Sequence, residues 1–180
     1  MYLLDTMVLS ELRKKERNPG VTQWLSGKSD QELFISVVSI GEIAKGIAQQ
    51  DKQDKEFAKL LKHWLEKLLL LYGQRILPVD IPIAKRWGEL SIQVQNSGVD
   101  ILLAATAMEH NLTIVTRNER HFSQTGIAIT YKSLAIDGHG QLPFKIGTRT
   151  GTISELELMM LTSRPKCANL RTCLKKSRCI

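Results

Sequence analysis

The sequence predicts an α/β fold with a mostly parallel central sheet flanked by helices. Short segments of β-branched and aliphatic residues alternate with segments whose apolar residues recur at helical spacing. This alternation is typical of units in which a helix crosses over between two parallel strands. It extends over residues 1–132, and from about Ser133 it decays into a polar stretch that contains several glycines. We therefore expect one α/β domain followed by an extension of different character.

The first half of the chain predicts two strand-and-helix units and a longer helix. Residues 3–4 are a short buried strand, and the apolar residues of 6–12 fall at helical spacing. Residues 33–40 are rich in β-branched side chains and predict a second strand, followed by a helix over 41–50. The helical spacing over 57–72 predicts the longer helix.

The second half continues the same pattern. Residues 76–79 predict a third strand, and Pro82 stands at a suitable first position for a helix over 82–95. A further helix over 101–110 precedes a fourth strand at 112–116. Residues 127–131 predict a fifth strand. Five short strands with helices between them are the basis of the predicted parallel sheet.

Charge divides the chain in the same place. The chain has 180 residues and a formal net charge of +7. Residues 1–131 contain 16 Lys and Arg against 15 Asp and Glu, whereas residues 132–180 contain nine against three. We interpret residues 133–180 as a basic, poorly ordered C-terminal extension, with contact to nucleic-acid phosphates as the alternative. Its three cysteines recur every six residues, a spacing that is a poor zinc signal.

Several function classes are excluded. No apolar run reaches the length of a membrane span, and the N-terminus does not resemble a secretory signal, so we expect a cytoplasmic protein without membrane contact. Gly27-Lys28-Ser29 ends like a phosphate-binding loop, but Thr22 occupies the position of the first glycine. An NTPase is therefore rejected, and no H-E-x-x-H or G-x-S-x-G motif is present.

Acidic residues stand where an α/β sheet collects functional groups. Asp5 follows the first strand, and the turn that contains Thr116 follows the fourth. Glu42 and Asp100 lie in the first turns of two predicted helices. Carboxylates brought together repel one another unless a cation neutralises them, and a hard ion with oxygen ligands suits them. We therefore predict a Mg²⁺ site, with Mn²⁺ as an alternative, that supports phosphodiester hydrolysis.

Each acid also has a purely structural interpretation. Asp5 and Asp100 have the residue type and position of helix N-caps, and Ser39 to Glu42 fits the S-x-x-E capping box. Ser10, with Glu11 beside it at the surface of the first helix, is expected to be solvated, although a polar group there could touch the site. The residues taken one at a time leave capping and metal binding open.

Four ordered segments carry a resemblance to a known family. Residues 3–12, which read LLDTMVLSEL, resemble the opening motif of PIN-domain nucleases, in particular the VapC and FitB toxins of bacterial toxin–antitoxin pairs. Segments 39–46, 100–107 and 112–118 match in order and spacing. The resemblance implies a PIN-like domain over 1–132 and a Mg²⁺-dependent endoribonuclease acting on RNA and held inactive by an antitoxin protein.

The resemblance also assigns residues, with two departures. It implies Asp5, Glu42 and Asp100 as the catalytic metal ligands. The family usually has asparagine where this chain has Met7, and an acid where this chain has His121. His121 could ligate Mn²⁺ through a neutral imidazole nitrogen, while Mg²⁺ prefers oxygen.

Three neighbouring side chains are predicted as accessory groups of the site: Thr116, Asn118 and His121. The alternative to an active ribonuclease is a catalytically impaired PIN-like protein that only binds antitoxin or RNA. We also expect a homodimer, for which the hydrophobic helical face over 57–68 is the candidate surface.

Overall fold

The computed structural model describes residues 1–14 and 16–130. The predicted extension over 133–180 lies outside the described residues, as does the last residue of the strand predicted over 127–131. The elements in chain order are β1 (Tyr2–Leu4), α1 (Thr6–Leu12), α2 (Pro19–Ser26), η1 (Asp30–Glu32), β2 (Leu33–Ser36), α3 (Val37–Asp51), α4 (Lys55–Tyr72), η2 (Gly73–Arg75), β3 (Ile76–Leu77), α5 (Ile81–Gln93), α6 (Val99–Glu109), β4 (Thr113–Val115), η3 (Glu119–His121) and β5 (Ile129–Thr130).

The strands form one sheet in the order β3-β2-β1-β4-β5, and every pair is parallel. The predicted α/β fold with a parallel sheet is therefore confirmed. In the register of the two central strands, Leu4 of β1 lies opposite Val115 of β4. Parallel strands end at the same edge, so the residues that follow Leu4 and Val115 are neighbours in space.

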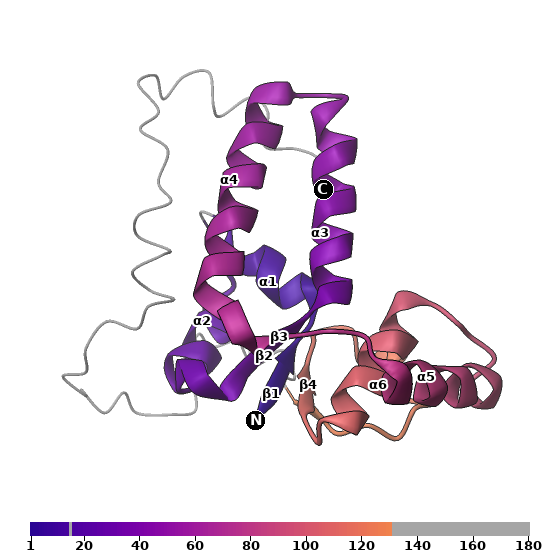
Figure 1. The fold of residues 1–180 in the computed structure, drawn as a ribbon. Helices are drawn as coiled ribbons and strands as arrows, with labels where there is room; N and C mark the ends of the chain where they lie inside the picture. Colours follow the sequence, from indigo (N-terminus) through magenta and orange to yellow (C-terminus); the bar gives the residue numbers. More distant parts are fainter. Residues whose placement is uncertain (15, 131–180) are drawn as a thin grey trace.

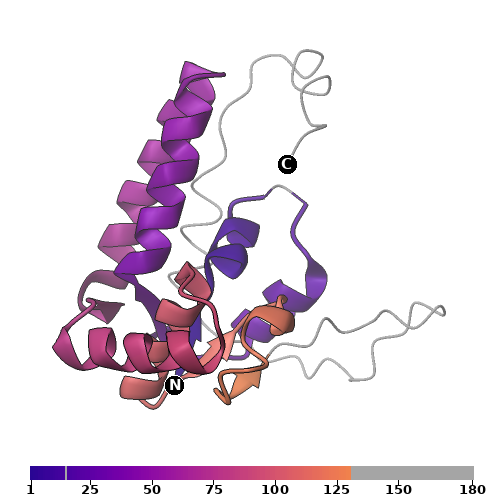
Figure 2. The ribbon, with the colours of Figure 1, turned by 90° about the vertical axis from the view of Figure 1, so that its right-hand side faces the viewer.

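Helices cover both faces of the sheet. Because successive strand residues point to opposite faces, Leu4 and Val115 contribute to a core formed with α1–α4, whereas Leu3 and Ile114 contribute to a core formed with α5 and α6. In Figure 1, α3 and α4 run side by side and extend beyond the sheet, while α5 and α6 lie together and away from that pair. The view in Figure 2, turned by 90°, shows the same separation.

The strand predicted over 33–40 is wrong beyond Ser36. β2 ends at Ser36, whose hydroxyl accepts a hydrogen bond of 3.1 Å from the backbone N–H of Val38 and so caps α3. The capping box predicted from Ser39 to Glu42 is also wrong, because both residues lie inside α3. A helix that begins earlier places Glu42 in its second turn.

The long α4 confirms the helix predicted over 57–72 and begins slightly earlier, at Lys55. Asp54 caps it by accepting a hydrogen bond of 3.0 Å from the Phe57 N–H. The buried residues recur at helical spacing: Ala58, Leu61, Trp64, Leu68 and Tyr72. Within the described part of the chain, no helix is both long and apolar enough to cross a membrane.

Local capping signals start two further helices. The helix α2 was not predicted from the sequence. Pro19 takes its first helical position and Asn18 caps its N-terminus. In α5, Asp80 caps the Ile83 N–H. The helix predicted over 101–110 begins at Val99, so Asp100 is the second helical residue and the N-cap interpretation of Asp100 is wrong.

Candidate functional site

Asp5 and Thr116 meet because β1 and β4 are adjacent and parallel. The backbone N–H of Asp5 donates to the Val115 carbonyl at 3.1 Å, which extends the sheet by one residue. The Thr116 hydroxyl then donates to Asp5 Oδ2 at 2.7 Å. Asp5 occupies the N-cap position of α1, but its side chain makes no capping hydrogen bond. The carboxylate is therefore directed to Thr116 and the space beyond it.

The environment of Asp5 disfavours its negative charge. The residue is only 5% exposed, and this burial raises the pKa of the Asp5 carboxyl above its usual value. The Thr116 hydroxyl opposes the rise by binding the charged form, and the nearby negative charge of Asp100 adds to it. A cation next to Asp5 would relieve both unfavourable contributions.

Asp100 is tied to Asp5 through a chain of polar contacts. His121 Nδ1 lies 2.6 Å from Asp100 Oδ2 and 2.9 Å from Asn118 Nδ2. One ring nitrogen either donates to the carboxylate or accepts from the amide, so the imidazole tautomer selects the partner. The backbone N–H of Asn118 donates to Thr116 Oγ1 at 2.9 Å. The three predicted accessory residues thus lie between the two aspartates.

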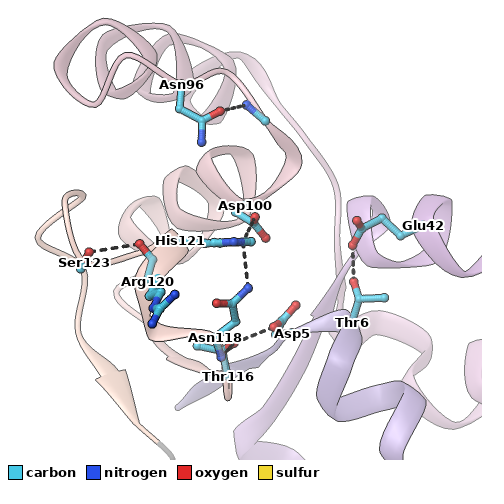
Figure 3. A network of polar contacts seen from close by, with 11 residues as sticks. Asp5, Thr6, Glu42, Asn96, Asp100, Thr116, Asn118, Arg120, His121 and Ser123 are labelled. Carbon is cyan, nitrogen blue, oxygen red and sulfur yellow. Dashed lines mark hydrogen bonds and ion pairs between the residues drawn. The ribbon is translucent and has the colours of Figure 1, made fainter. Parts of the chain in front are cut away.

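Glu42 reaches the same region from α3. Thr6 Oγ1 donates to Glu42 Oε2 at 2.5 Å, and Thr6 is the residue after Asp5. Thr6 was not predicted as a residue of the site, although its position directly after Asp5 could have indicated it. In Figure 3 the side chains of Asp5, Asp100 and Glu42 approach one region from three different elements.

The donor set fits a hard divalent cation. The three acids offer carboxylate oxygens, which Mg²⁺ and Mn²⁺ accept as ligands. None of the three forms an ion pair with a Lys or Arg among residues 1–14 and 16–130; the only basic partner there is His121, on Asp100. In this same part of the chain, no three Asp, Glu, His or Cys side chains converge as a ready-made metal-binding group. Asp5, Glu42 and Asp100 thus surround the region with oxygen donors without closing on one point.

Glu11 differs from the expectation that it lies at the surface of the first helix. It is only 3% exposed; its carboxylate accepts from Lys14 Nζ at 2.7 Å and from the Asn18 N–H at 2.9 Å, and Arg117 Nη1 lies 3.9 Å away. Burial alone would raise the pKa of Glu11, but the contacts with Lys14 and Asn18 outweigh it, so the pKa is lowered. Glu11 therefore joins the end of α1 to the loop after β4 and to the start of α2.

Met7 lies beside the site without contributing a polar side-chain group. It is among the exposed large hydrophobic residues, at the position where the resemblance implies an asparagine. The polar contacts of the site come instead from Thr6, Thr116 and Asn118.

Known proteins share this arrangement of the chain. The PIN domain model matches residues 2–128. Over 135 residues the chain is 31% identical to toxin FitB of Neisseria gonorrhoeae, covering 72% of this chain and 96% of FitB. It is 29% identical over 135 residues to a VapC ribonuclease of Sinorhizobium fredii, covering 72% and 95%.

The fold agrees with these matches. The crystal structure of FitAcB from Neisseria gonorrhoeae superimposes with a TM-score of 0.66 at 30% identity, covering 73% of this chain and 97% of the solved one. A family match that spans most of the chain and a fold shared with a solved relative agree with each other. The chain belongs to the PIN domain family.

Proposed function

We propose that the chain is a Mg²⁺-dependent endoribonuclease, able to use Mn²⁺, that hydrolyses RNA phosphodiester bonds. The observation that carries the proposal is the approach of Asp5, Glu42 and Asp100 from three elements to one region without a Lys or Arg counter-ion among the described residues. The relative in Sinorhizobium fredii is named a ribonuclease. Residues 1–132 would form the nuclease domain, and 133–180 its basic extension.

The protein's part in this reaction is to hold oxygen ligands in place. Thr116 orients Asp5, Thr6 orients Glu42, and His121 orients Asp100. A bound divalent cation supplies Lewis-acid activation of the phosphodiester and neutralises the charge that develops during hydrolysis. Burial of Asp5 strengthens its attraction for that cation, because few water molecules compete there.

RNA cleavage with and without the metal tests the proposal. The wild type is expected to cleave RNA in Mg²⁺ or Mn²⁺ and to stop in EDTA, and Asp5→Asn is expected to lose at least about a hundredfold in rate, since a metal ligand is removed. Asp51→Asn is a matched control, because Asp51 lies at the exposed end of α3 and pairs with Lys62. Equal cleavage by the wild type and Asp5→Asn would contradict the assignment.

We further propose that the protein is the toxin of a toxin–antitoxin pair. FitB, at 31% identity, is named a toxin. Induced expression of the wild type is expected to arrest bacterial growth, Asp5→Asn is expected to be harmless at the same protein level, and co-expression of the cognate antitoxin is expected to restore growth. Growth arrest by both forms would separate toxicity from the carboxylate site.

His121 is the observation that favours a second candidate, a catalytically impaired PIN-like protein that binds antitoxin or RNA. Its imidazole contacts Asp100 at the place where the resemblance implies an acid. If the wild type binds no Mg²⁺ by calorimetry while His121→Asp does, this second candidate replaces the first.

The predicted homodimer is also a proposal. Exposed apolar side chains, among them Phe57 and Leu60, lie on α4 within the helical face expected to pair two copies. Exposed apolar side chains that lie together on one surface are typical of an interaction site. Light scattering on the purified protein is expected to give twice the mass of one chain.

A further inference from the structure

A groove that includes Glu42 follows one side of α3. Its volume is about 500 Å³, and it is lined by Val38, Gly41, Glu42, Lys45, Gly46, Gln49 and, from the start of α6, Val99. Most of the α3 residues are separated by three or four positions, so they form a stripe on one helix face. Val38 and Gln49 are eleven positions apart, which corresponds to roughly 16 Å at the rise of an α-helix.

We propose that this groove holds a single-stranded segment of RNA next to the cleaved phosphodiester, with Lys45 contacting a phosphate. The inference rests on the proposed function, because it places the substrate of the same site. Glu42 belongs both to the groove and to the carboxylate region. A strand that enters the carboxylate region has to continue along the adjoining surface, and the groove is continuous with that region at Glu42.

Charge and lining suit a nucleic-acid strand. Lys45 lies one helical turn after Glu42 and forms no ion pair with any described residue, so its ammonium group is free to bind a phosphate. Gln49, one turn further, offers an amide that donates and accepts hydrogen bonds. Val38 and Val99 add apolar surface on which a ribose or base can pack.

The two glycines of the groove have no internal structural requirement. Gly41 and Gly46 lie inside α3 at ordinary helical backbone angles, and a Cβ added to either would meet no atom within 4 Å. A glycine in a helix interior costs about 1 kcal/mol relative to alanine. Their absent side chains keep the groove open, so a larger residue at Gly46 would occupy the place assigned to RNA.

Gly88 of α5 provides a matched control. It also lies in a helix, and a Cβ there would also meet no atom within 4 Å, but it does not line the groove. Gly46→Leu and Gly88→Leu therefore make the same chemical change in similar helical surroundings. For Lys45→Ala the control is Lys52→Ala, at the C-cap of the same helix and outside the groove.

The experiment measures binding of a fluorescein-labelled oligouridylate by anisotropy over a range of salt concentrations. All variants are made in full-length Asp5→Asn protein, so that the probe stays intact. Lys45→Ala is expected to weaken binding about fivefold and to reduce the salt slope by about 0.7, the value for one phosphate of a single strand. Gly46→Leu is expected to weaken binding by at least about tenfold, with helical circular dichroism and thermal midpoint like those of Gly88→Leu.

The outcomes separate this inference from the proposed function. If Lys45→Ala and Gly46→Leu bind the probe as tightly as Lys52→Ala and Gly88→Leu, the inference is overturned and the groove is left to a protein partner. Metal-dependent cleavage by the protein with Asp5 intact is measured in parallel. If the wild type cleaves RNA but the groove variants bind the probe normally, only the groove inference is refuted. If the groove variants lose binding but the wild type does not cleave RNA, the groove is supported and the proposed ribonuclease activity is refuted.

Discussion

Thr116→Val tests whether one buried hydroxyl organises the carboxylate region. Thr116 is fully buried, donates to Asp5 Oδ2 at 2.7 Å and receives the Asn118 N–H at 2.9 Å. Valine keeps the shape of the side chain and removes both contacts. A hydrogen bond to a charged group contributes roughly 1.5–3 kcal/mol and a neutral one roughly 0.5–1.5 kcal/mol. We expect the free energy of unfolding at neutral pH to fall by about 2–4 kcal/mol.

Urea denaturation followed by circular dichroism measures this loss. Thr113→Val is the control, because Thr113 begins β4, the strand that Thr116 follows, and its hydroxyl has no hydrogen-bond partner among the described residues. It is expected to change stability by less than about 0.5 kcal/mol. A Thr116→Val loss no larger than that of Thr113→Val would refute the organising role.

The same variant has a pH signature. The Thr116 hydroxyl binds the charged form of Asp5 and so lowers its pKa, against the larger effect of burial. Below the pKa of Asp5 the carboxyl is protonated, and its hydrogen bond with Thr116 becomes a weaker neutral one. We therefore expect the difference in unfolding free energy between wild type and Thr116→Val to shrink as the pH falls, beginning above the usual range for aspartate.

Four further variants test other parts of the structure. Because the pKa of Glu11 is lowered, its carboxylate stabilises the folded protein above the ordinary glutamate pKa, and this stabilisation is lost as the pH falls through the pKa in the folded state. Glu11→Gln should therefore reduce the free energy of unfolding at neutral pH by about 1–3 kcal/mol. In urea titrations the variant should also lose less stability than the wild type as the pH falls. The raised pKa of Asp5 has the opposite sign, so Asp5→Asn should stabilise the protein at neutral pH, with the gain vanishing in acid. His121→Asp should tighten Mg²⁺ binding by calorimetry roughly tenfold or more. Leu60→Glu should convert the proposed dimer to a monomer in light scattering.

The sequence predicted the fold where periodic patterns were long. The helix over 57–72 was recognisable because its apolar residues repeat over many positions, and the parallel sheet because short strand segments alternate with helical ones. The run over 33–40 was harder, because β-branched residues favour a strand locally while the hydroxyl of Ser36 starts a helix. A capping contact of this kind depends on one side-chain geometry, which the letters of the sequence do not determine.

The candidate site was predictable in part, from the positions of its residues at the ends of strands. Asp5 and Thr116 each follow a strand, so their placement at one sheet edge could be expected. Their direct contact depends on the strand order, which puts β1 beside β4. Glu11 shows the opposite case: it was expected at the surface of the first helix, whereas it is buried with partners nearby in sequence, Lys14 and Asn18, and with the distant Arg117. Contacts between particular side chains, and not residue type alone, decided both outcomes.

The burial of Asp5 separates what the fold requires from what the proposed reaction requires. A carboxylate that is 5% exposed and near a second acid reduces the stability of the protein at neutral pH. Asparagine could accept the same hydrogen bond from Thr116 without that cost, so packing alone does not account for an acid at this position. The negative charge of Asp5 becomes favourable once a divalent cation stands beside it, since binding to the folded state alone adds to stability. If Mg²⁺ or Mn²⁺ raises the thermal midpoint of the wild type but not of Asp5→Asn, the acid serves the cation; an equal rise in both would assign that stabilisation to another site.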